Sequence, residues 1–202
     1  MSLSALASRC SRVADSSYAP SLRTRHLPED WQKLRHAYTV RVTDAAEPHL
    51  SDAIEQLSRV SRFEDVTTIV RKAARELSGA DGVTFVVRDG DRCYYADESA
   101  IQPLWKGKRF VAATCISGWV MRNRQAVAIP DIYADPRIPH EAYRPTFVKS
   151  MAMVPVYDPD PIAAIGAYWA NHHVPTEREL SILKVLADAS ARALGHSSPR
   201  PR

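Results

Sequence analysis

The chain has 202 residues, with 27 lysines and arginines against 23 aspartates and glutamates, so its formal net charge is +4. This length suits one domain with an appended segment, and a composition that is 45% apolar and 25% charged is typical of a globular protein. No apolar run approaches the roughly 20 residues that cross a bilayer, so we expect no membrane-spanning function. Three scattered cysteines (Cys10, Cys93 and Cys115) exclude a disulfide framework or a zinc cluster and predict a reducing, cytoplasmic location.

The basic residues are spread along the chain and interleaved with acidic ones. Arg71 and Lys72, for example, are followed by Glu76. A surface that binds nucleic acid needs positive charge gathered on one face of the protein. We therefore expect a solvated surface of mixed charge and no nucleic-acid partner.

Both ends of the chain differ in composition from its centre. Residues 1–48 are rich in serine, alanine and arginine and show no sustained helix or strand period, which predicts a flexible N-terminal arm. An ordered domain is predicted over residues 49–196, followed by a short tail at residues 197–202. A short docked helix inside the arm is an alternative, with a stripe formed by Trp31, Leu34 and Tyr38.

Three helices are predicted from apolar residues that recur at helical spacing. The first covers residues 50–60. The second begins at residues 61–64, a capping box in which a serine is followed three residues later by a glutamate, and it ends at Gly79. The third begins at a threonine-glutamate capping box, residues 176–179, and ends at Gly195.

Short runs of β-branched and aromatic residues predict a sheet between the second and third helices. Asp89-Gly90 is a strong tight-turn dipeptide, so it predicts a hairpin. A short helix is predicted at residues 116–124, and a long irregular span with three prolines at 131–149. We expect strands at residues 83–88, 93–96, 126–129, 151–156 and 162–169, with one more short strand before residue 114. Because hairpins require antiparallel pairing, an α+β fold follows.

Several segments, in their order along the chain, resemble the GAF domain family, a small-molecule-sensing module common in bacterial signalling proteins. They are ISGWV (116–120), AIPDIYADPR (128–137), VKSMAMVPV (148–156), IGAYW (165–169) and PTE (175–177) leading to LAD (186–188). The likeness covers roughly residues 63–194 and is strongest to GAF modules that precede bacterial kinase or cyclase output domains. It implies an antiparallel sheet of about six strands. The N- and C-terminal helices would pack on one face, and loops and short helices would roof a ligand pocket on the other.

Aromatic and polar residues of the predicted roof are the candidates for ligand binding. Aromatic side chains with a polar group suit a pocket that orients a flat or polar ligand, although core packing is the alternative explanation. Arg137 could meet an anionic ligand or clamp its own loop through Asp135, and Asp131 is expected to accept backbone hydrogen bonds. We assign the ligand-binding role to Trp105, Cys115, Trp119, Tyr133, Arg137 and Tyr143.

The cysteines and histidines predict no catalytic or metal site. Cys115 lies near the start of a predicted helix, which would lower its pKa, or it is a small buried apolar residue, as we expect Cys93 to be. His172 and His173 point apart in an extended chain, which predicts a solvated loop. No nucleophile triad, paired-carboxylate motif or glycine-rich phosphate loop stands out, so we expect no catalytic residue, no metal and no cofactor.

The resemblance implies a non-enzymatic sensor or regulatory protein of bacterial signal transduction, as in two-component systems, with an unknown small-molecule ligand. Eight residues follow Leu194, with no phospho-accepting helix, so we expect a separate kinase or cyclase output protein as partner. One alternative is an enzyme similar to free methionine-R-sulfoxide reductase, although Ser117 stands where that family has cysteine. Another alternative is a dimerisation module that has lost its ligand.

The predicted first helix lies outside this resemblance and carries its own apolar stripe, Leu50, Ile54, Leu57 and Val60. An isolated helix of about eleven residues is marginal in water, so the stripe needs a partner. We expect the other two long helices to cover the sheet already. A second copy of the chain would then cover the stripe, and we predict a homodimer.

Overall fold

The computed structural model describes residues 47–195, so the predicted arm up to residue 46 and the predicted tail at residues 197–202 lie outside the described residues. Along the chain come two helices, a hairpin, a central stretch of loops and short elements, a second hairpin and a last helix. The elements are α2 (Glu47–Ser58), α3 (Phe63–Ser78), β1 (Gly82–Asp89), β2 (Arg92–Ala100), β3 (Arg109–Val111), the 3-10 turn η1 (Ala112–Thr114), α4 (Ile116–Asn123), β4 (Val127–Ile129), α5 (His140–Tyr143), β5 (Ser150–Asp158), β6 (Asp160–Trp169) and α6 (Glu177–Gly195).

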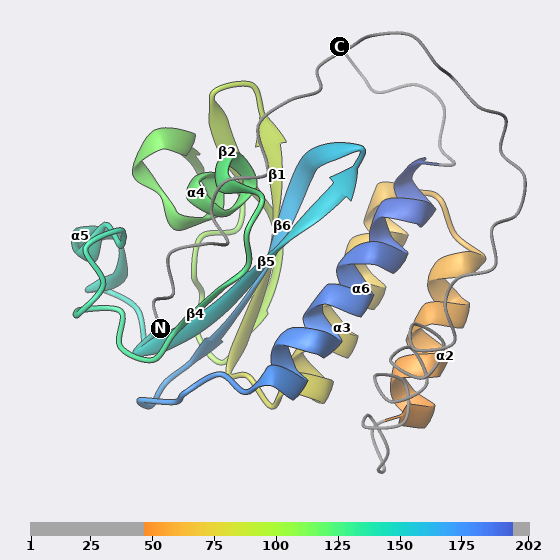
Figure 1. Cartoon of the computed structure of the whole chain (residues 1–202), viewed down its shortest axis with the longest axis horizontal. Helices are drawn as coiled ribbons and strands as arrows, with labels where there is room; N and C mark the ends of the chain where they lie inside the picture. The colour runs from red at the N-terminus through yellow and green to blue at the C-terminus, as the bar shows by residue number, and fades with distance from the viewer. Residues whose placement is uncertain (1–46, 196–202) are drawn as a thin grey trace, which may run out of the picture. The chain divides into compact units, whose positions relative to one another are not determined.

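The six strands form one sheet in the order β3-β2-β1-β6-β5-β4, and every neighbouring pair is antiparallel. The β1–β2 hairpin turns at Gly90, whose φ of 61° is the left-handed conformation that the Asp-Gly dipeptide predicts. Figure 1 shows α2, α3 and α6 on one side of the sheet and α4 and α5 on the other. The predicted α+β fold, with long helices on one face and loops and short helices on the other, is confirmed.

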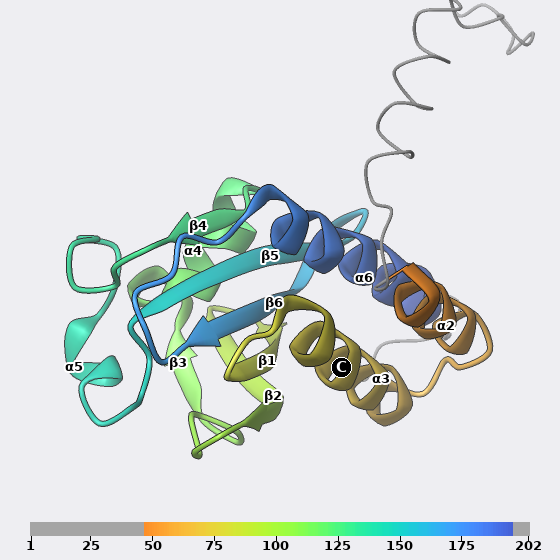
Figure 2. The same ribbon diagram turned by 90° about the horizontal axis from the view of Figure 1, so that it is seen from below.

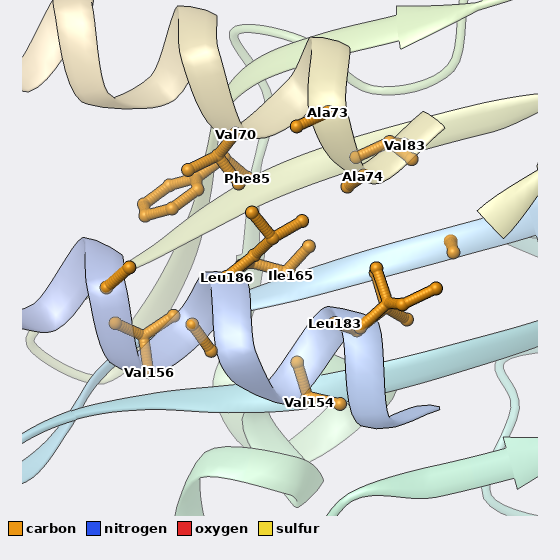
Figure 3. Packing of buried hydrophobic residues seen from close by; sticks show 14 of the residues in the cluster. Val70, Ala73, Ala74, Val83, Phe85, Val154, Val156, Ile165, Leu183 and Leu186 are labelled. Atoms are coloured by element: carbon orange, nitrogen blue, oxygen red, sulfur yellow. The ribbon is translucent and has the colours of Figure 1, made fainter. Parts of the chain in front are cut away.

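The core on the helical side is built from the apolar stripes of α3 and α6. Val70 and Ala73 lie three residues apart on α3, and Leu183 and Leu186 have the same spacing on α6, so each pair shares one helix face. Figure 3 shows these side chains between the helices and the strands, with Phe85 of β1 at one end of the cluster and Leu183 at the other. Fully burying one such large apolar side chain contributes about 1.5–3 kcal/mol, so this layer supports the sheet on which the opposite face is built.

The apolar stripe of α2 is covered inside the chain. Leu50, Ala53 and Leu57 are buried, with exposed fractions of 8, 4 and 1%, and α2 packs against α3 and α6. Figure 2 shows α2 beside these two helices. The inference that the stripe needs a second copy of the chain was wrong, because α2 covers the other two helices and does not compete with them for the sheet. The homodimer itself stays a prediction.

The two predicted capping boxes have different outcomes. At α3 the prediction was wrong by one residue. The N-cap is Arg62, because the backbone N–H groups of Asp65 and Val66 donate to its carbonyl, and Arg62 provides no side-chain cap. Ser61 precedes the N-cap position. At α6 the prediction is confirmed. Thr176 Oγ1 accepts a hydrogen bond from Glu179 N (3.2 Å), and Glu179 Oε2 accepts one from Thr176 N (2.6 Å).

One extra residue in β2 changes which of its side chains face the helices. Phe85 of β1 pairs with Asp97, whereas the next residue, Val86, pairs with Tyr95, so Ala96 is a bulge. Because side chains alternate along a strand, one unpaired residue exchanges the two faces beyond it. Asp97 therefore faces the helices, and its neighbour Glu98 turns to the opposite side.

Candidate functional site

The first of two loops that cover the face away from α3 and α6 is residues 101–108, here the first roof loop. Glu98, turned to this side by the bulge, holds it through backbone hydrogen bonds. Its Oε1 accepts from Leu104 N (3.0 Å), and its Oε2 accepts from Trp105 N and Lys106 N (both 2.8 Å). Hydrogen bonds to a charged acceptor are stronger than those to a neutral one, so this carboxylate fixes the position of Trp105.

The second roof loop is residues 130–149, and short-range polar contacts brace it internally. Asp131 Oδ1 accepts a hydrogen bond from the backbone N–H two residues further on (2.9 Å), as predicted. Asp135 Oδ1 accepts from both the backbone N and the Nε of Arg137 (2.9 Å each), which confirms the predicted loop clamp. The hydrogen bond from Arg137 also lowers the pKa of Asp135, so the clamp stays charged at neutral pH.

Four aromatic rings meet beneath the two loops. Trp105 of the first loop and Tyr143, at the end of α5 in the second, lie edge to face with ring centroids 4.8 Å apart. The Trp105 ring also packs edge to face on two rings of the sheet, Tyr95 at 5.4 Å and Tyr168 at 5.6 Å. Such pairs contribute about 0.5–1.5 kcal/mol beyond their buried area. In this structure, these rings occupy the space beneath the roof.

The structure divides the six predicted ligand-binding residues into two sets. One set is buried beneath the roof: Trp105, Cys115 and Tyr143. The other set lies half-buried or exposed on the outside: Trp119, Tyr133 and Arg137. In this outer set the guanidinium of Arg137 stacks on the Trp119 ring, 4.5 Å from its centroid. The six residues thus line the inner and outer surfaces of one roof and do not converge on one point.

Two thiols meet beneath the roof beside this cluster. Cys93 of β2 is fully buried, and Cys115, between η1 and α4, is 6% exposed. Cys115 Sγ lies 3.2 Å from Ser117 Oγ, and the Cys93 thiol hydrogen bonds to both Cys115 and Ser117. The hydroxyl of Tyr95 lies 3.4 Å from the same Ser117 oxygen. Cys93, Cys115 and Ser117 therefore form one buried polar cluster, here the thiol cluster.

The thiol cluster separates the acidities of its two cysteines. The hydrogen bond from Cys93 lowers the pKa of Cys115 to about 6; the Ser117 hydroxyl and the first backbone N–H groups of α4 also lower it, against desolvation. The pKa of Cys93 is raised by its hydrogen bond to Cys115 and by burial. The contacts of the cluster therefore favour the thiolate, the form in which cysteine is a nucleophile, at Cys115 rather than at Cys93.

Sequence reasoning missed half of this arrangement. The prediction that Cys93 is a small buried residue is confirmed, but the sequence analysis did not pair it with Cys115 and did not single out Tyr95 or Glu98. Strand alternation puts Cys93 and Tyr95 on one face of β2, so that part was available from the sequence. No local sequence pattern predicts the bulge at Ala96 or the contact between Cys93 and Cys115.

A surface cleft of about 490 Å³ lies on the helical side of the molecule, along α3. Three basic side chains of α3 line it, Arg71, Lys72 and Arg75. Arg71 Nε is 2.9 Å from a carboxylate oxygen of Asp97, and Arg75 donates to the hydroxyl of Ser99 (3.2 Å). Two of the three basic side chains therefore connect α3 to β2, and the sequence did not predict this cleft.

The loop before α6 is largely exposed, as predicted, and His172 is exposed, but His173 is half-buried and contacts the body of the protein. The His173 ring lies 4.5 Å from the Trp169 ring, and its Nε2 is 2.9 Å from a carboxylate oxygen of Glu179. Within residues 47–195, no group of three or more histidine, cysteine or acidic side chains is placed to hold a metal ion. In the same part of the chain, no helix has the length and apolarity needed to cross a bilayer.

Residues 60–195 match the family model described as GAF domain. The chain therefore belongs to the GAF domain family, in agreement with the motifs and with the observed fold. No curated protein matches the chain.

Solved structures of other GAF-fold proteins superpose on most of the chain. The GAF domain of a phosphoenolpyruvate-protein phosphotransferase from Acinetobacter has a TM-score of 0.66 at 13% identity, covering 76% of this chain and 95% of that one. Free methionine-R-sulfoxide reductase from Neisseria meningitidis, in complex with its substrate, has a TM-score of 0.64 at 18% identity, covering 75% and 91%. The chromophore-binding domain of a bacteriophytochrome from R. palustris has a TM-score of 0.62 at 13% identity, covering 74% and 61%. At these identities the likeness establishes the fold.

Proposed function

We propose that the protein is a non-enzymatic regulatory protein of bacterial signal transduction, which senses a small molecule beneath the roof and acts through a partner chain. The observation that carries the proposal is the aromatic cluster. Trp105 of the first roof loop packs on two tyrosines of the sheet, and Tyr143 of the second roof loop packs on Trp105. Outward movement of the loops would expose Tyr95 and Tyr168, whose rings and hydroxyls suit a flat ligand with polar edges.

The way in which the loops are held supports this movement. The second roof loop is braced internally at Asp131 and Asp135, so it can shift as a unit. The first roof loop depends on the carboxylate of Glu98 for three of its backbone hydrogen bonds. A ligand shifts such an equilibrium only by binding the open state more tightly than the closed one.

Other proteins of this fold hold small molecules in their solved structures. The reductase from Neisseria meningitidis contains its substrate, and another similar structure has bound biliverdin. These proteins support ligand binding as a class of function for this chain.

The test is to release and identify whatever the full-length protein binds in its own host. The protein is purified without denaturation and then unfolded, and the released molecules are analysed by mass spectrometry. We expect a molecule in stoichiometric amount from the wild type and from the Trp169→Phe control, which changes a tryptophan on the helical side of the sheet. We expect its loss from Trp105→Phe, which lacks the indole beneath the roof. If the wild type releases nothing, the sensing proposal fails and the ligand-free dimerisation module takes its place.

A second candidate function is reduction of free methionine-R-sulfoxide, and the thiol cluster is the observation that favours it. That chemistry needs a nucleophilic thiol and a second thiol to resolve the intermediate, and Cys115 and Cys93 lie together. Against it, Ser117 stands where the reductases have a cysteine. Turnover of free methionine-R-sulfoxide with thioredoxin, absent from Cys115→Ser, would overturn the non-enzymatic proposal.

For the partner chain, we propose a second copy of this protein, which forms a homodimer, and a separate kinase or cyclase as the output protein. Light scattering of the wild type measures the first part directly. A Leu57→Asp substitution on α2 cannot test dimerisation, because Leu57 is 1% exposed and the buried carboxylate would disrupt the fold of the monomer itself. A monomeric mass at tens of micromolar would end the homodimer proposal.

A further inference from the structure

We propose that Cys93 and Cys115 are a redox-active pair, which hydroperoxides convert to a disulfide beneath the roof. The proposal concerns a covalent modification site. It stands on the placement of the two sulfurs, and it does not depend on whether the roof binds a small molecule or whether the protein reduces a sulfoxide.

The fold brings the two cysteines together through a turn of the chain at the sheet edge. Cys93 pairs with Phe110 of β3, at the edge of the sheet. Directly after β3 the chain folds back, because Ala112 N donates a hydrogen bond to the carbonyl of Asp91 (2.8 Å), just before β2. Three residues later, Cys115 lies over the strand that carries Cys93, and the two thiols hydrogen bond. The pairing of β2 with β3 and the turn after β3 therefore bring together two cysteines that are 22 residues apart in sequence.

The two sulfurs differ in access and in bonding, and these differences assign their roles. Cys115 is 6% exposed and borders exposed residues of η1, whereas Cys93 has no exposed surface. Cys115 Sγ also has the hydroxyl of Ser117 at 3.2 Å, which donates to a thiolate. Cys115 is therefore the sulfur that meets the oxidant, and Cys93 is the sulfur that resolves the product.

The chemistry takes two balanced steps. The Cys115 thiolate attacks one oxygen of a hydroperoxide, the O–O bond breaks, and the alkoxide leaves and is protonated, which gives a sulfenic acid and an alcohol. The Cys93 sulfur then attacks the sulfenic sulfur, and the S–S bond forms as water leaves with the Cys93 proton. Overall, two thiols and one hydroperoxide give one disulfide, one alcohol and one water. A small dithiol reverses the change.

The disulfide would alter the contacts beneath the roof. Both cysteines hydrogen bond to Ser117, which also lies 3.4 Å from the hydroxyl of Tyr95. Joining the sulfurs removes the two thiol groups that hydrogen bond to Ser117, and it links the start of α4 covalently to β2. Ser117 then keeps the Tyr95 hydroxyl as its partner in this cluster, and the Tyr95 ring is the one on which Trp105 packs.

The experiment uses the full-length chain with Cys10→Ser, so that only the two cysteines of interest remain. The reduced protein is exposed to hydrogen peroxide, alkylated and digested with trypsin without reduction. Cleavage separates the cysteines into peptides 93–106 and 110–122. We expect one linked pair of these peptides, lighter by two hydrogens than their sum, with both thiols lost to alkylation and both recovered after dithiothreitol.

Two variants and one unfolded sample serve as controls. Cys93→Ala should stop at a sulfenic acid on Cys115, captured by dimedone, and Cys115→Ser should leave Cys93 unoxidised at the same peroxide dose. The wild-type pair unfolded in guanidinium should form the link much more slowly than the folded protein. The proposal is overturned if both thiols of the folded protein stay free, or if Cys115 proceeds to sulfinic acid while Cys93 stays a thiol. Either result leaves the ligand-sensing proposal untouched.

Discussion

Replacing Glu98 by alanine is expected to release the first roof loop at a large cost in stability. The carboxylate accepts three backbone hydrogen bonds, from Leu104, Trp105 and Lys106. Lys106 is exposed, so its N–H can turn to water, but Leu104 and Trp105 are only 7 and 4% exposed. Leaving a buried donor without an acceptor costs about 1–3 kcal/mol, so two such donors lower the free energy of unfolding by about 2–6 kcal/mol.

The glutamine variant refines this prediction. In Glu98→Gln, the amide oxygen can take the place of Oε2, which accepts from Trp105 and Lys106, while the amide nitrogen then faces the N–H of Leu104. One buried donor is left unpaired in place of two, so we expect a cost of about 1–3 kcal/mol. Glu76→Ala, an exposed glutamate on α3, is the matched control and should stay within about 0.5 kcal/mol of the wild type.

Urea unfolding followed by circular dichroism measures the three free energies. Tryptophan emission provides a local readout, because Trp105 should become more accessible to acrylamide in Glu98→Ala before the global transition. The expected order of stability is wild type, then Glu98→Gln, then Glu98→Ala. If Glu98→Ala unfolds at the same urea concentration as the wild type, the loop is held by its side-chain packing and the reasoning from the carboxylate is refuted.

Three further predictions test other parts of the structure. A Cβ on Gly118 would lie 1.9 Å from the carbonyl oxygen of Ala112, so Gly118→Ala should destabilise the protein by about 1–3 kcal/mol or more, despite a helix-propensity gain of about 1 kcal/mol. A midpoint temperature of thermal unfolding that rises or stays unchanged contradicts this prediction. Thr176→Ala should cost about 1 kcal/mol in urea unfolding through the lost cap, whereas the exposed Lys184→Ala on the same helix should not; equal effects mean that the cap is unimportant. The alkylation rate of Cys115 should increase with pH through a pKa of about 6, below the usual thiol value of about 8.5. Because the folded-state pKa is the lower one, the stability of the wild type relative to Cys115→Ser should rise between about pH 6 and 8.5 and be lost as the pH falls through 6. A stability difference that does not depend on pH argues against the thiolate.

The sequence by itself determined the features that depend on neighbouring residues. The Asp-Gly turn at residue 90, the cap at Thr176, the Asx turn at Asp131 and the Asp135–Arg137 clamp are all where the pattern predicts them. In each, the donor and acceptor are within three residues of each other, so side-chain chemistry at that position decides the geometry. The long helices follow for a similar reason, because one apolar stripe defines one buried face.

Only the tertiary structure decided how distant segments share those faces. The stripe of α2 needs a cover, and the sequence does not say whether a second copy or the other helices provide it; the packing of Leu57 against the rest of the chain answers this. The bulge at Ala96 reverses the faces of β2 beyond it and so turns Glu98 towards the roof loops. The meeting of Cys93 with Cys115 depends on the β2–β3 pairing and on the turn after it, both set by long-range backbone hydrogen bonds, which carry no residue-specific pattern in the sequence.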